Sequence, residues 1–478
     1  MNYRMIRYIL GWILIFSALF MIVPMITALC YTEKAGLAFL LAAGISAGLG
    51  GLCVLNKPVK TELHARDGFV IVSLSWIILS LSGCMPFIFS GAIPHFIDAL
   101  FETVSGYTTT GASILNEVES LPKCVLIWRS FIHWIGGMGV LVFIMAFMQL
   151  SGGQNMHLMK AESPGPSVSK LVPRVRTTAM LLYSIYFVLT LAEFVMLLFA
   201  DMSVFDALNT SFATAGTGGF GVKNTSLGGF SPAVQIIVTV FMMLFATNFS
   251  SYYLIMKGSF KDAFNSEIRL FFAIAITAAI IIAVNISDMY GSFGEAARHS
   301  AFTVASVMST TGFATTDFNL WPELSRSLVV ILTFVGGCAG STCGGIKISR
   351  IIILFKSMGK ELQNLVHPKQ VKKIVIDKRP VEHEVVRSVN VYMVCLVMIF
   401  VLSLLVISFD NHDFTTNFTS VATCLNNVGP GLNMVGPMGN FSSFSYLSKS
   451  VLIFDMLAGR LEIFPILALF SRGTWKNH

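Results

Sequence analysis

Long apolar runs of about 20 residues recur along the whole chain, separated by shorter polar or weakly apolar segments. A helix of about 20 predominantly apolar residues is long enough to cross a lipid bilayer. The pattern predicts ten spanning helices, and this even number leaves both termini on the same side. They are expected at 7–31, 36–55, 69–90, 124–150, 178–200, 231–256, 269–287, 327–355, 389–409 and 447–470.

Four weaker apolar segments lie between alternate pairs of these runs and begin near residues 94, 203, 294 and 411. Each is too polar to span and ends in a cluster of small and polar residues. The clusters are SGYTTTGAS (105–113), ATAGTGGFG (213–221), SVMSTTGFA (306–314) and TCLNNVGPG (423–431). Their aligned glycines are Gly111, Gly219, Gly312 and Gly429. A repeat of about 105 residues predicts an all-α polytopic membrane protein with four helix–hairpin–helix units in pseudo-fourfold arrangement, preceded by two extra helices.

Composition supports a membrane protein and excludes two other classes. Of the 478 residues, 55% are hydrophobic and 12% are charged, whereas soluble domains carry about 25% charged residues. The net charge of +7 could indicate nucleic-acid binding. The basic residues fall between apolar runs, however, so we predict no nucleic-acid partner and interpret them as topology determinants. The eight cysteines form no CxxC pair and are interpreted as reduced core residues, not as metal ligands or disulfides.

Lys and Arg gather on one side of the predicted membrane. Positive charge marks the cytoplasmic side of a membrane protein, so both termini are expected in the cytoplasm and the four weak segments enter from outside. The outer side has an acidic bias from Asp98, Glu102, Glu117, Glu119, Asp201, Asp206 and Asp413. We interpret these residues as a vestibule that concentrates cations, with ordinary surface solvation as the alternative.

Four irregular segments at membrane depth predict a pore lining, because such backbone survives only where it is buried in protein or lines a water-filled path. Backbone carbonyls, helped by Thr hydroxyls, can replace the hydration shell of a cation. Glycine permits the positive φ that turns successive carbonyls inward. No carboxylate lies inside the four motifs, which argues against a divalent-cation site. The alternative is a set of turns that only packs the bundle.

The motifs TTGAS, TGGFG, TTGFA and NVGPG, each between two spanning helices, resemble the filters of the Trk/Ktr/HKT superfamily of potassium transporters. The resemblance covers nearly the whole chain, and the two extra N-terminal spans are most similar to the Trk-type membrane subunit. It implies four M1–P–M2 potassium-channel-like repeats around one path for potassium, in a homodimer in the bacterial inner (plasma) membrane. It implies no enzyme activity and no organic cofactor. The filter residues it implies are Thr109, Thr110, Gly111, Thr217, Gly218, Gly219, Thr310, Thr311, Gly312, Asn427, Val428 and Gly429.

The run 327–355 is interrupted by GGCAGSTCGGIK (336–347). Each Gly in a helix interior costs about 1 kcal/mol relative to Ala, so we expect a break at mid-membrane. In the resembled family this place holds an intramembrane gating loop, and the gate residues would be Gly336, Gly337, Gly340, Ser341, Thr342, Gly344 and Gly345. Close helix packing through small residues is the alternative. A phosphate-binding loop is excluded because Ile346 separates Gly345 from Lys347.

Arg460 lies inside the last spanning run. An ionisable residue in a membrane segment is a functional hypothesis by default. The resemblance implies that Arg460 faces the pore beneath the filter as an electrostatic barrier. A buried structural salt bridge is the alternative, although Glu462 lies on a different helix face.

We divide the chain into an N-terminal two-helix domain (1–60), repeat 1 (61–155), repeat 2 (170–260), repeat 3 with the loop (265–358), a cytoplasmic connection (359–388) and repeat 4 (389–478). The basic connection could contact lipid headgroups. The resemblance implies that it binds a cytosolic nucleotide-binding regulatory subunit, TrkA-like and of the RCK type.

The function we predict is gated potassium uptake through a single filter. Alternatives are sodium- or proton-coupled symport and less selective conduction of potassium and sodium. Coupling has little support, because we find no carboxylate in mid-span except near Asp455 and Glu462. A membrane enzyme would need a clustered nucleophile, base or metal set, and residues such as His133 lack partners at metal spacing. A scaffold without transport would not require four buried polar hairpins.

Overall fold

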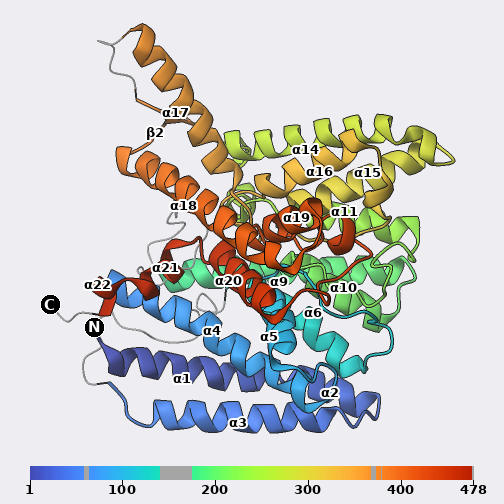
Figure 1. The fold of residues 1–478 in the computed structure, drawn as a ribbon, viewed down its shortest axis with the longest axis vertical. Helices are drawn as coiled ribbons and strands as arrows, with labels where there is room; N and C mark the ends of the chain where they lie inside the picture. Colours follow the sequence, from blue (N-terminus) through green and yellow to red (C-terminus); the bar gives the residue numbers. More distant parts are fainter. Residues whose placement is uncertain (59–63, 140–174, 368–372, 378, 476–478) are drawn as a thin grey trace.

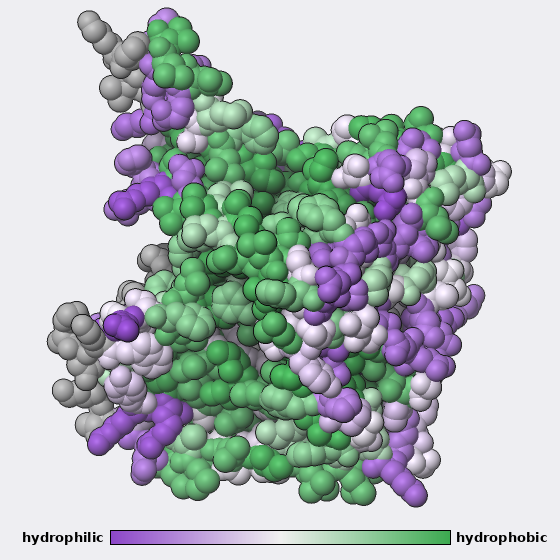
Figure 2. Space-filling view, in the orientation of Figure 1, coloured by the Kyte–Doolittle hydropathy of each residue, from purple (hydrophilic) through white to green (hydrophobic). Residues whose placement is uncertain are grey.

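The structure is a computed structural model that describes residues 1–58, 64–139, 175–367, 373–377 and 379–475. Helices make up most of it, and the long ones run side by side across the molecule (Figure 1). The space-filling view has a broad hydrophobic surface across the middle, with hydrophilic residues gathered along its right edge and at its left ends (Figure 2). This distribution is typical of a protein whose middle is solvated by lipid.

Two N-terminal spans pack against the first repeat, as the sequence predicts. The first consists of α1 (Tyr3–Phe20) and α2 (Ile22–Cys30), and the second is α3 (Gly36–Val54). Ser17 and Ser46 each share a hydrogen bond of 2.8 Å with Ser82 of the following helix. Such hydroxyl pairs hold helices together where no hydrophobic driving force acts between them.

Each repeat consists of a long first helix, a short pore helix and a second helix. The first helices are α4 (Ala65–Phe89), α9 (Val175–Phe199), α14 (Ser266–Asn285) and α18 (His383–Ile407). The pore helices are α5 (Phe96–Tyr107), α10 (Val204–Gly216), α15 (Phe293–Met308) and α19 (Phe414–Leu425). The second helices begin with α6 (Lys123–Gly137), α11 (Pro232–Phe245), α16 (Glu323–Val335) and α20 (Tyr446–Arg460). The predicted polytopic helical fold is confirmed.

Three of the second helices are broken within the described residues, and the sequence predicted only one of these breaks. The expected interruption of 327–355 separates α16 from α17 (Ile348–Val366). The predicted continuous spans 231–256 and 447–470 are wrong. The former is bent by 90° between α11 and α12 (Phe249–Met256), and the latter is broken between α20 and α21 (Phe464–Phe470). The part of the predicted span 124–150 that follows Gly139 lies outside the described residues.

These breaks explain why fewer helices than ten are long and apolar enough to cross a membrane by themselves. Among the described residues six pass, or seven if the bent pair counts as one span. The other second helices, α6, α16 and α20, contain only 15, 13 and 15 residues.

Hydrogen bonds between the segments that follow the pore helices join the four repeats. They run from Val118 N to Asn224 Oδ1 (2.8 Å), from Leu227 N to Ala314 O (2.9 Å), from Asn433 N to Asn319 Oδ1 (2.9 Å) and from Phe441 N to Ser113 O (2.8 Å). Repeat 1 contacts repeat 2, repeat 2 contacts repeat 3, repeat 3 contacts repeat 4, and repeat 4 returns to repeat 1. The repeats therefore form a closed ring.

Short elements complete the chain. They are α13 (Phe260–Ala263), α22 (Arg472–Trp475), the 3₁₀ helices η1 (Ser287–Met289), η2 (Phe318–Leu320), η3 (Ser408–Asp410) and η4 (Asn433–Val435), and the strands β1 (Val375–Ile376) and β2 (Arg379–Pro380). The two strands pair antiparallel in the connection 359–388. Helix α17 extends away from the bundle at the top of Figure 1, and the strands lie beside it.

Candidate functional site

The four hairpins share an unusual backbone conformation. Thr109, Thr217, Thr310 and Asn427 have φ of 56°, 55°, 53° and 54°, and the glycines two residues later have φ of 80°, 77°, 82° and 95°. Residues other than glycine rarely adopt positive φ. The same strained conformation at matched places in four different sequences is typical of a functional segment. Left-handed residues at alternate positions turn successive carbonyls toward one side.

Each of the four glycines lies against a backbone carbonyl of the next repeat, and together these contacts form a closed ring. A Cβ atom on Gly111 would lie 2.1 Å from Gly218 O, and one on Gly219 would lie 2.0 Å from Thr311 O. A Cβ atom on Gly312 would lie 2.3 Å from Val428 O, and one on Gly429 would lie 2.5 Å from Thr110 O. Each glycine thus abuts the carbonyl that precedes the glycine of the next repeat. No side chain fits here, so the sequence requires glycine at all four places.

The twelve residues predicted for the filter lie in the four hairpins, and their polar side chains are buried. The hydroxyls of Thr109, Thr110, Thr217, Thr310 and Thr311 belong to fully buried residues. The side chain of Asn427 donates to Thr110 Oγ1 (3.0 Å) and so joins repeat 4 to repeat 1. Among the described residues, no group of three or more His, Cys, Asp or Glu side chains could hold a metal ion. The ring offers neutral oxygens only, which suits a monovalent cation.

The loop 336–347 lies against the lower end of the ring. Its Gly344 N–H donates to Thr310 Oγ1 (2.8 Å), the threonine with positive φ in the third hairpin. A Cβ atom on Gly344 would lie 2.5 Å from Asn426 O, which directly precedes the fourth hairpin's Asn427. The loop therefore contacts two of the four hairpins from below.

The other loop residues predicted for the gate bend the backbone or bond locally. Gly336, Gly340 and Gly345 have φ of 70°, 74° and 76°. Ser341 Oγ donates to Cys338 O (2.6 Å), and Thr342 Oγ1 donates to Phe245 O at the end of α11 (3.3 Å). A Cβ atom on Gly337 would lie 2.8 Å from Cys343 Sγ, so the two ends of the loop pack closely.

Two neighbouring elements anchor the loop. At the bend between α11 and α12, Cys338 N donates to Ala246 O (2.9 Å) and Phe249 N donates to Gly340 O (3.1 Å). On α14, Glu267 Oε1 accepts from Ala339 N (2.7 Å) and Ser349 N (3.2 Å) and so holds both sides of the loop. Sequence reasoning missed Glu267. Its only signal was a carboxylate two residues before the predicted span 269–287.

Arg460 joins the loop to the first repeat. Its guanidinium donates to Thr342 O (2.6 Å), Gly136 O (2.5 Å) and Gly137 O (2.8 Å). The two glycine carbonyls form the C-terminal end of α6, where a cation is favoured by the helix dipole. The structure places this charge between the loop and the C-terminal end of α6.

Glu462 forms its ion pair with Arg350 of α17, which also donates to Ile346 O (3.2 Å) and lies 4.1 Å from the ring centre of Tyr392. The break after α20 is therefore tied to the helix that follows the loop. Lys347 is buried, has φ of 79° and donates to Cys343 O. Three basic side chains, Lys347, Arg350 and Arg460, thus gather around the loop.

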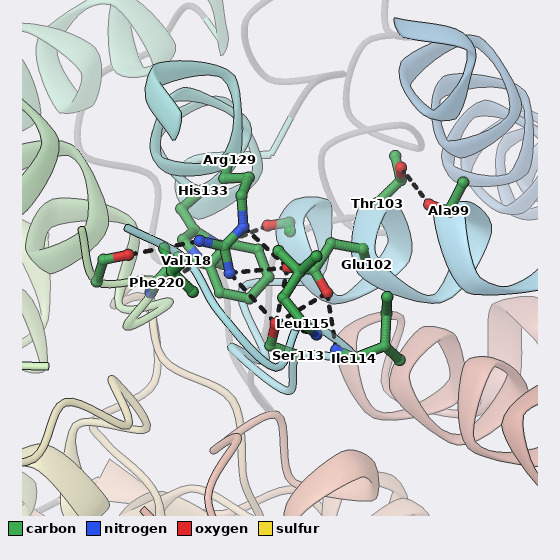
Figure 3. A network of polar contacts seen from close by, with 12 residues as sticks. Ala99, Glu102, Thr103, Ser113, Ile114, Leu115, Val118, Arg129, His133 and Phe220 are labelled. Atoms are coloured by element: carbon green, nitrogen blue, oxygen red, sulfur yellow. Dashed lines mark hydrogen bonds and ion pairs between the residues drawn. The ribbon is translucent and has the colours of Figure 1, made fainter. Parts of the chain in front are cut away.

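The structure corrects the interpretation of two acidic residues. Glu102, which we assigned to the outer vestibule, is fully buried and pairs with Arg129 (2.8 Å) (Figure 3). Glu193 was overlooked although it lies inside the predicted span 178–200. It is fully buried on α9, and its carboxylate oxygens have no hydrogen-bond partner among the described residues. Asp455 is also buried, and it accepts from Ser403 Oγ (2.7 Å).

Comparison with known proteins shows similarity over the whole chain. The family described as "TrkH: Cation transport protein" matches residues 38–475. The chain is 37% identical to the Trk system potassium uptake protein TrkH of Escherichia coli K12, with 100% of both chains covered. It is 34% identical to TrkG of the same organism, with 99% of both covered. The crystal structure of the potassium transporter TrkH from Vibrio parahaemolyticus matches with a TM-score of 0.89 and 33% identity over 100% of both chains.

Proposed function

The chain belongs to the TrkH family of cation transport proteins, and on this premise we propose that it takes up potassium across the bacterial plasma membrane. The protein is a multi-pass helical membrane protein, and its curated relatives are named transporters, not enzymes. The observation that carries the proposal is the closed ring of glycine–carbonyl contacts, which sets neutral oxygens of four repeats around one axis. Potassium is the transported ion, and carbonyl oxygens replace its hydration shell.

The test is growth of a host that lacks its own potassium uptake systems. We expect the wild-type chain, supplied with its cytosolic partner, to restore growth at low potassium, and Gly111→Asp to abolish this growth. A carboxylate in the ring has no space and would bind the cation too tightly to release it. Failure of the wild type to rescue, with the protein present in the membrane, contradicts the proposal.

Selectivity for potassium over sodium is expected to be looser than in a channel with four identical filters. The second and fourth hairpins have Gly218 and Val428 where the others have Thr. The structure supplies a reason for Gly218, because a Cβ atom there would lie 2.2 Å from His133 Nδ1. We propose that this hairpin has glycine instead of threonine because the second helix of repeat 1 packs too closely to leave room for a side chain.

We propose that the loop 336–347 is the gate. It contacts the third hairpin through Gly344, and its glycines with positive φ permit a change of conformation. Arg460 holds the loop through Thr342 O and adds a positive charge that opposes cation passage. Opening would require the loop to leave Thr310 and to exchange its anchors on Glu267 and Arg460 for other partners.

The cytoplasmic connection is the proposed docking site of a nucleotide-binding regulatory subunit of the TrkA-like, RCK type. Its hairpin is tied to the gate region, since Asp377 accepts from Ser266 N (3.1 Å) directly before Glu267, which holds the loop. Lys356 Nζ donates to Val375 O (2.6 Å) on the first strand. A partner that moves this hairpin would act on α14 and α17 together. We expect that replacing 373–382 by a Gly/Ser linker stops the regulatory subunit from copurifying with this protein.

We further propose a homodimer. Helix α17 extends from the bundle with one apolar face exposed, and a groove of about 790 Å³ lies between this helix, α14 and α16. Phe355 and Met358 line this groove, although they are 65% and 56% exposed in the single chain. A second copy would cover them. Cross-linking through Met358→Cys in a background without the native cysteines tests this surface. We expect a covalent dimer, and a protein that stays monomeric after cross-linking contradicts the proposal.

Proton-coupled symport is the second candidate, and Glu193 and Asp455 favour it. Both carboxyls are fully buried inside spanning helices, where ionisable groups often belong to proton relays. Uptake of potassium into vesicles with and without an imposed pH gradient distinguishes the two candidates. A response that disappears in Asp455→Asn or Glu193→Gln supports coupling, whereas identical rates support conduction down the electrochemical gradient. Both termini are expected on the cytoplasmic side.

A further inference from the structure

A buried ion pair lies behind the first and second hairpins. Glu102 of pore helix α5 and Arg129 of α6 are 0% and 2% exposed, and Arg129 Nη2 lies 2.8 Å from Glu102 Oε1. Arg129 Nε also donates to the same oxygen (2.9 Å). Neither side chain faces the ring or the lipid. A pair of charges so deeply buried costs desolvation free energy and is weak evidence for stability by itself.

The carboxylate of Glu102 holds the segment that leaves the first hairpin. It accepts from Ser113 Oγ (3.0 and 3.1 Å to its two oxygens) and from Ile114 N (3.0 Å). These residues come two and three positions after Gly111 of the ring. Hydrogen bonds to an ionised carboxylate are about twice as strong as neutral ones. The pore helix and the exit of its own hairpin are therefore tied together through one side chain.

The guanidinium of Arg129 reaches the second hairpin. It donates to Gly221 O (3.4 Å), and its carbon lies 4.2 Å from the ring centre of Phe220. Phe220 and Gly221 directly follow Gly219 of the ring. Figure 3 shows the side chain of Arg129 between Glu102 and Phe220. The ion pair thus bridges the exits of two hairpins that are more than 100 residues apart in the sequence.

His133, one helical turn after Arg129, repeats this bridge. Its Nε2 accepts from Phe220 N (3.3 Å), so the proton must be on Nδ1, which donates to Gly106 O (2.7 Å). Gly106 belongs to the pore helix before the first hairpin. One face of α6 therefore holds the first and second hairpins in register from behind.

The bridge is confined to this quadrant of the described structure. Glu102 lies nine residues before Gly111, and the matching positions in the other repeats are Thr210, Thr303 and Ser420. The exit segments of repeats 3 and 4 are held by neutral bonds, such as Ser306 Oγ to Phe313 O (2.6 Å) and Leu432 N to Thr419 Oγ1 (3.0 Å). The charged pair is therefore not a general requirement for building a hairpin of this shape.

We propose that Glu102 and Arg129 are positioning residues that set ion selectivity by fixing the first hairpin relative to the second. The inference rests on the proposed function of the ring. The pair is electrically neutral, so it adds little field on the axis, and its influence is geometric. Potassium and sodium differ in the carbonyl arrangement that replaces their hydration shells. If the ion pair is lost, the two carbonyl segments can shift relative to each other. Discrimination between potassium and sodium should then decrease before transport itself is lost.

The test compares sodium and rubidium uptake by the full chain in liposomes, with rubidium as the potassium substitute. In Glu102→Gln/Arg129→Met both charges disappear together and the volumes are nearly kept, a replacement that usually preserves folding. We expect the sodium-to-rubidium ratio to rise about tenfold, because specificity is a difference between two binding free energies. In Arg129→Lys the ion pair survives but the fork that reaches Gly221 is lost, and a rise of about threefold is expected.

The matched control is Asp98→Asn/Lys449→Gln. This ion pair (2.6 Å; side chains 15% and 5% exposed) joins the same pore helix to α20, four residues before Glu102. Lys449 Nζ also donates to Ser442 O (3.0 Å) in repeat 4, and within the described structure the pair has no hydrogen bond to the exits of the first and second hairpins. We expect its ion ratio to equal that of the wild type.

An unchanged ratio in both bridge variants, or an equal rise in the control, overturns the inference and leaves the proposed function intact. If the charge-free double variant does not reach the membrane, Arg129→Lys decides alone. Absence of rubidium uptake by the wild type overturns the proposed function, and this inference with it.

Discussion

The upper and lower halves of the four repeats differ in symmetry. The upper half contains the four hairpins, which differ in sequence but adopt the same pair of positive φ values. Each makes the same glycine–carbonyl contact with the next, so that the contacts form a ring. In the lower half, the second helices diverge: α6 ends at Gly137, α11 and α12 meet at 90°, a loop of twelve residues separates α16 from α17, and α20 ends before a short break. Under the proposed function this difference has a reason: an ion on the axis would contact all four hairpins, so their backbone must match, whereas one segment would be enough to close the path.

The largest effect should come from breaking the ring. In Gly111→Ala the new Cβ would lie 2.1 Å from Gly218 O. We expect potassium uptake to fall about a hundredfold, because a displacement of 1 Å at a reacting centre can cost that much. Rubidium uptake per amount of membrane protein measures it.

Gly91→Ala is the matched control for this substitution. Gly91 has φ of 73°, close to the 80° of Gly111, but a Cβ atom there would meet nothing within 4 Å. Both variants carry the backbone strain of about 1–2 kcal/mol, and only one carries the clash. Equal uptake by the two variants would remove the ring from the transport path.

The next effect should come from the lower half. Shortening the loop within 338–344 is expected to raise flux on the order of tenfold, since gating motions limit many turnover rates. Flux through liposomes without the regulatory subunit measures it. Unchanged or lower flux in correctly folded protein would exclude the loop as the gate.

A milder variant of the same experiment is Glu267→Gln, which weakens the two backbone hydrogen bonds that hold the loop. We expect a smaller rise in flux, without any change in the sodium-to-rubidium ratio. A change of ratio would show that the lower half also shapes the ring, and would weaken the contrast between the two halves.

Arg460→Ala should raise conductance about threefold, because removal of a fixed positive charge beneath the ring raises the local cation concentration. Arg460→Lys keeps the charge but loses the forked contacts with Gly136 and Gly137. Near-normal conductance in Arg460→Lys therefore assigns the effect to charge. If Arg460→Ala alters only the amount of folded protein, the side chain is structural.

The smallest effect concerns the cap of the fourth pore helix. Asp413 accepts from Thr416 N (3.0 Å), and hydrogen bonds from Thr416 hold the pKa of this carboxyl below its ordinary value. Asp413→Ala should lower the free energy of unfolding at neutral pH by about 1 kcal/mol, with unchanged ion selectivity.

The pH dependence follows from the sign of this shift. Because the folded-state pKa is lowered, the stabilisation by Asp413 is fully present above its ordinary pKa and disappears as the pH falls through the folded-state value. Thermal unfolding of wild type and Asp413→Ala in detergent should therefore converge in acid. A constant difference at all pH values contradicts this assignment.

The sequence by itself determined the class, the repeat and the ring. Membrane spans follow from length and hydropathy, and the four hairpins were recognisable because a glycine recurs between spanning pairs. Glycine is also the residue whose role depends least on distant partners, since positive φ and lack of a side chain are local properties. For this reason the four aligned glycines could be picked out from the chain, and the family resemblance added the residues beside them. The break after α20 at Leu461–Ile463 contains no glycine and was not predicted.

Only the tertiary structure decided the partners of the charged side chains. Glu102 had the sequence context of a solvated outer carboxylate, yet it pairs with Arg129, 27 residues later on another helix. Glu462 forms its ion pair with Arg350, 112 residues away, although Arg460 is only two residues before it in the sequence. Glu267 holds a loop that begins about 70 residues later. A charge inside a membrane protein must find a partner wherever the packing brings one, and that choice is a property of three-dimensional proximity, which no local pattern encodes.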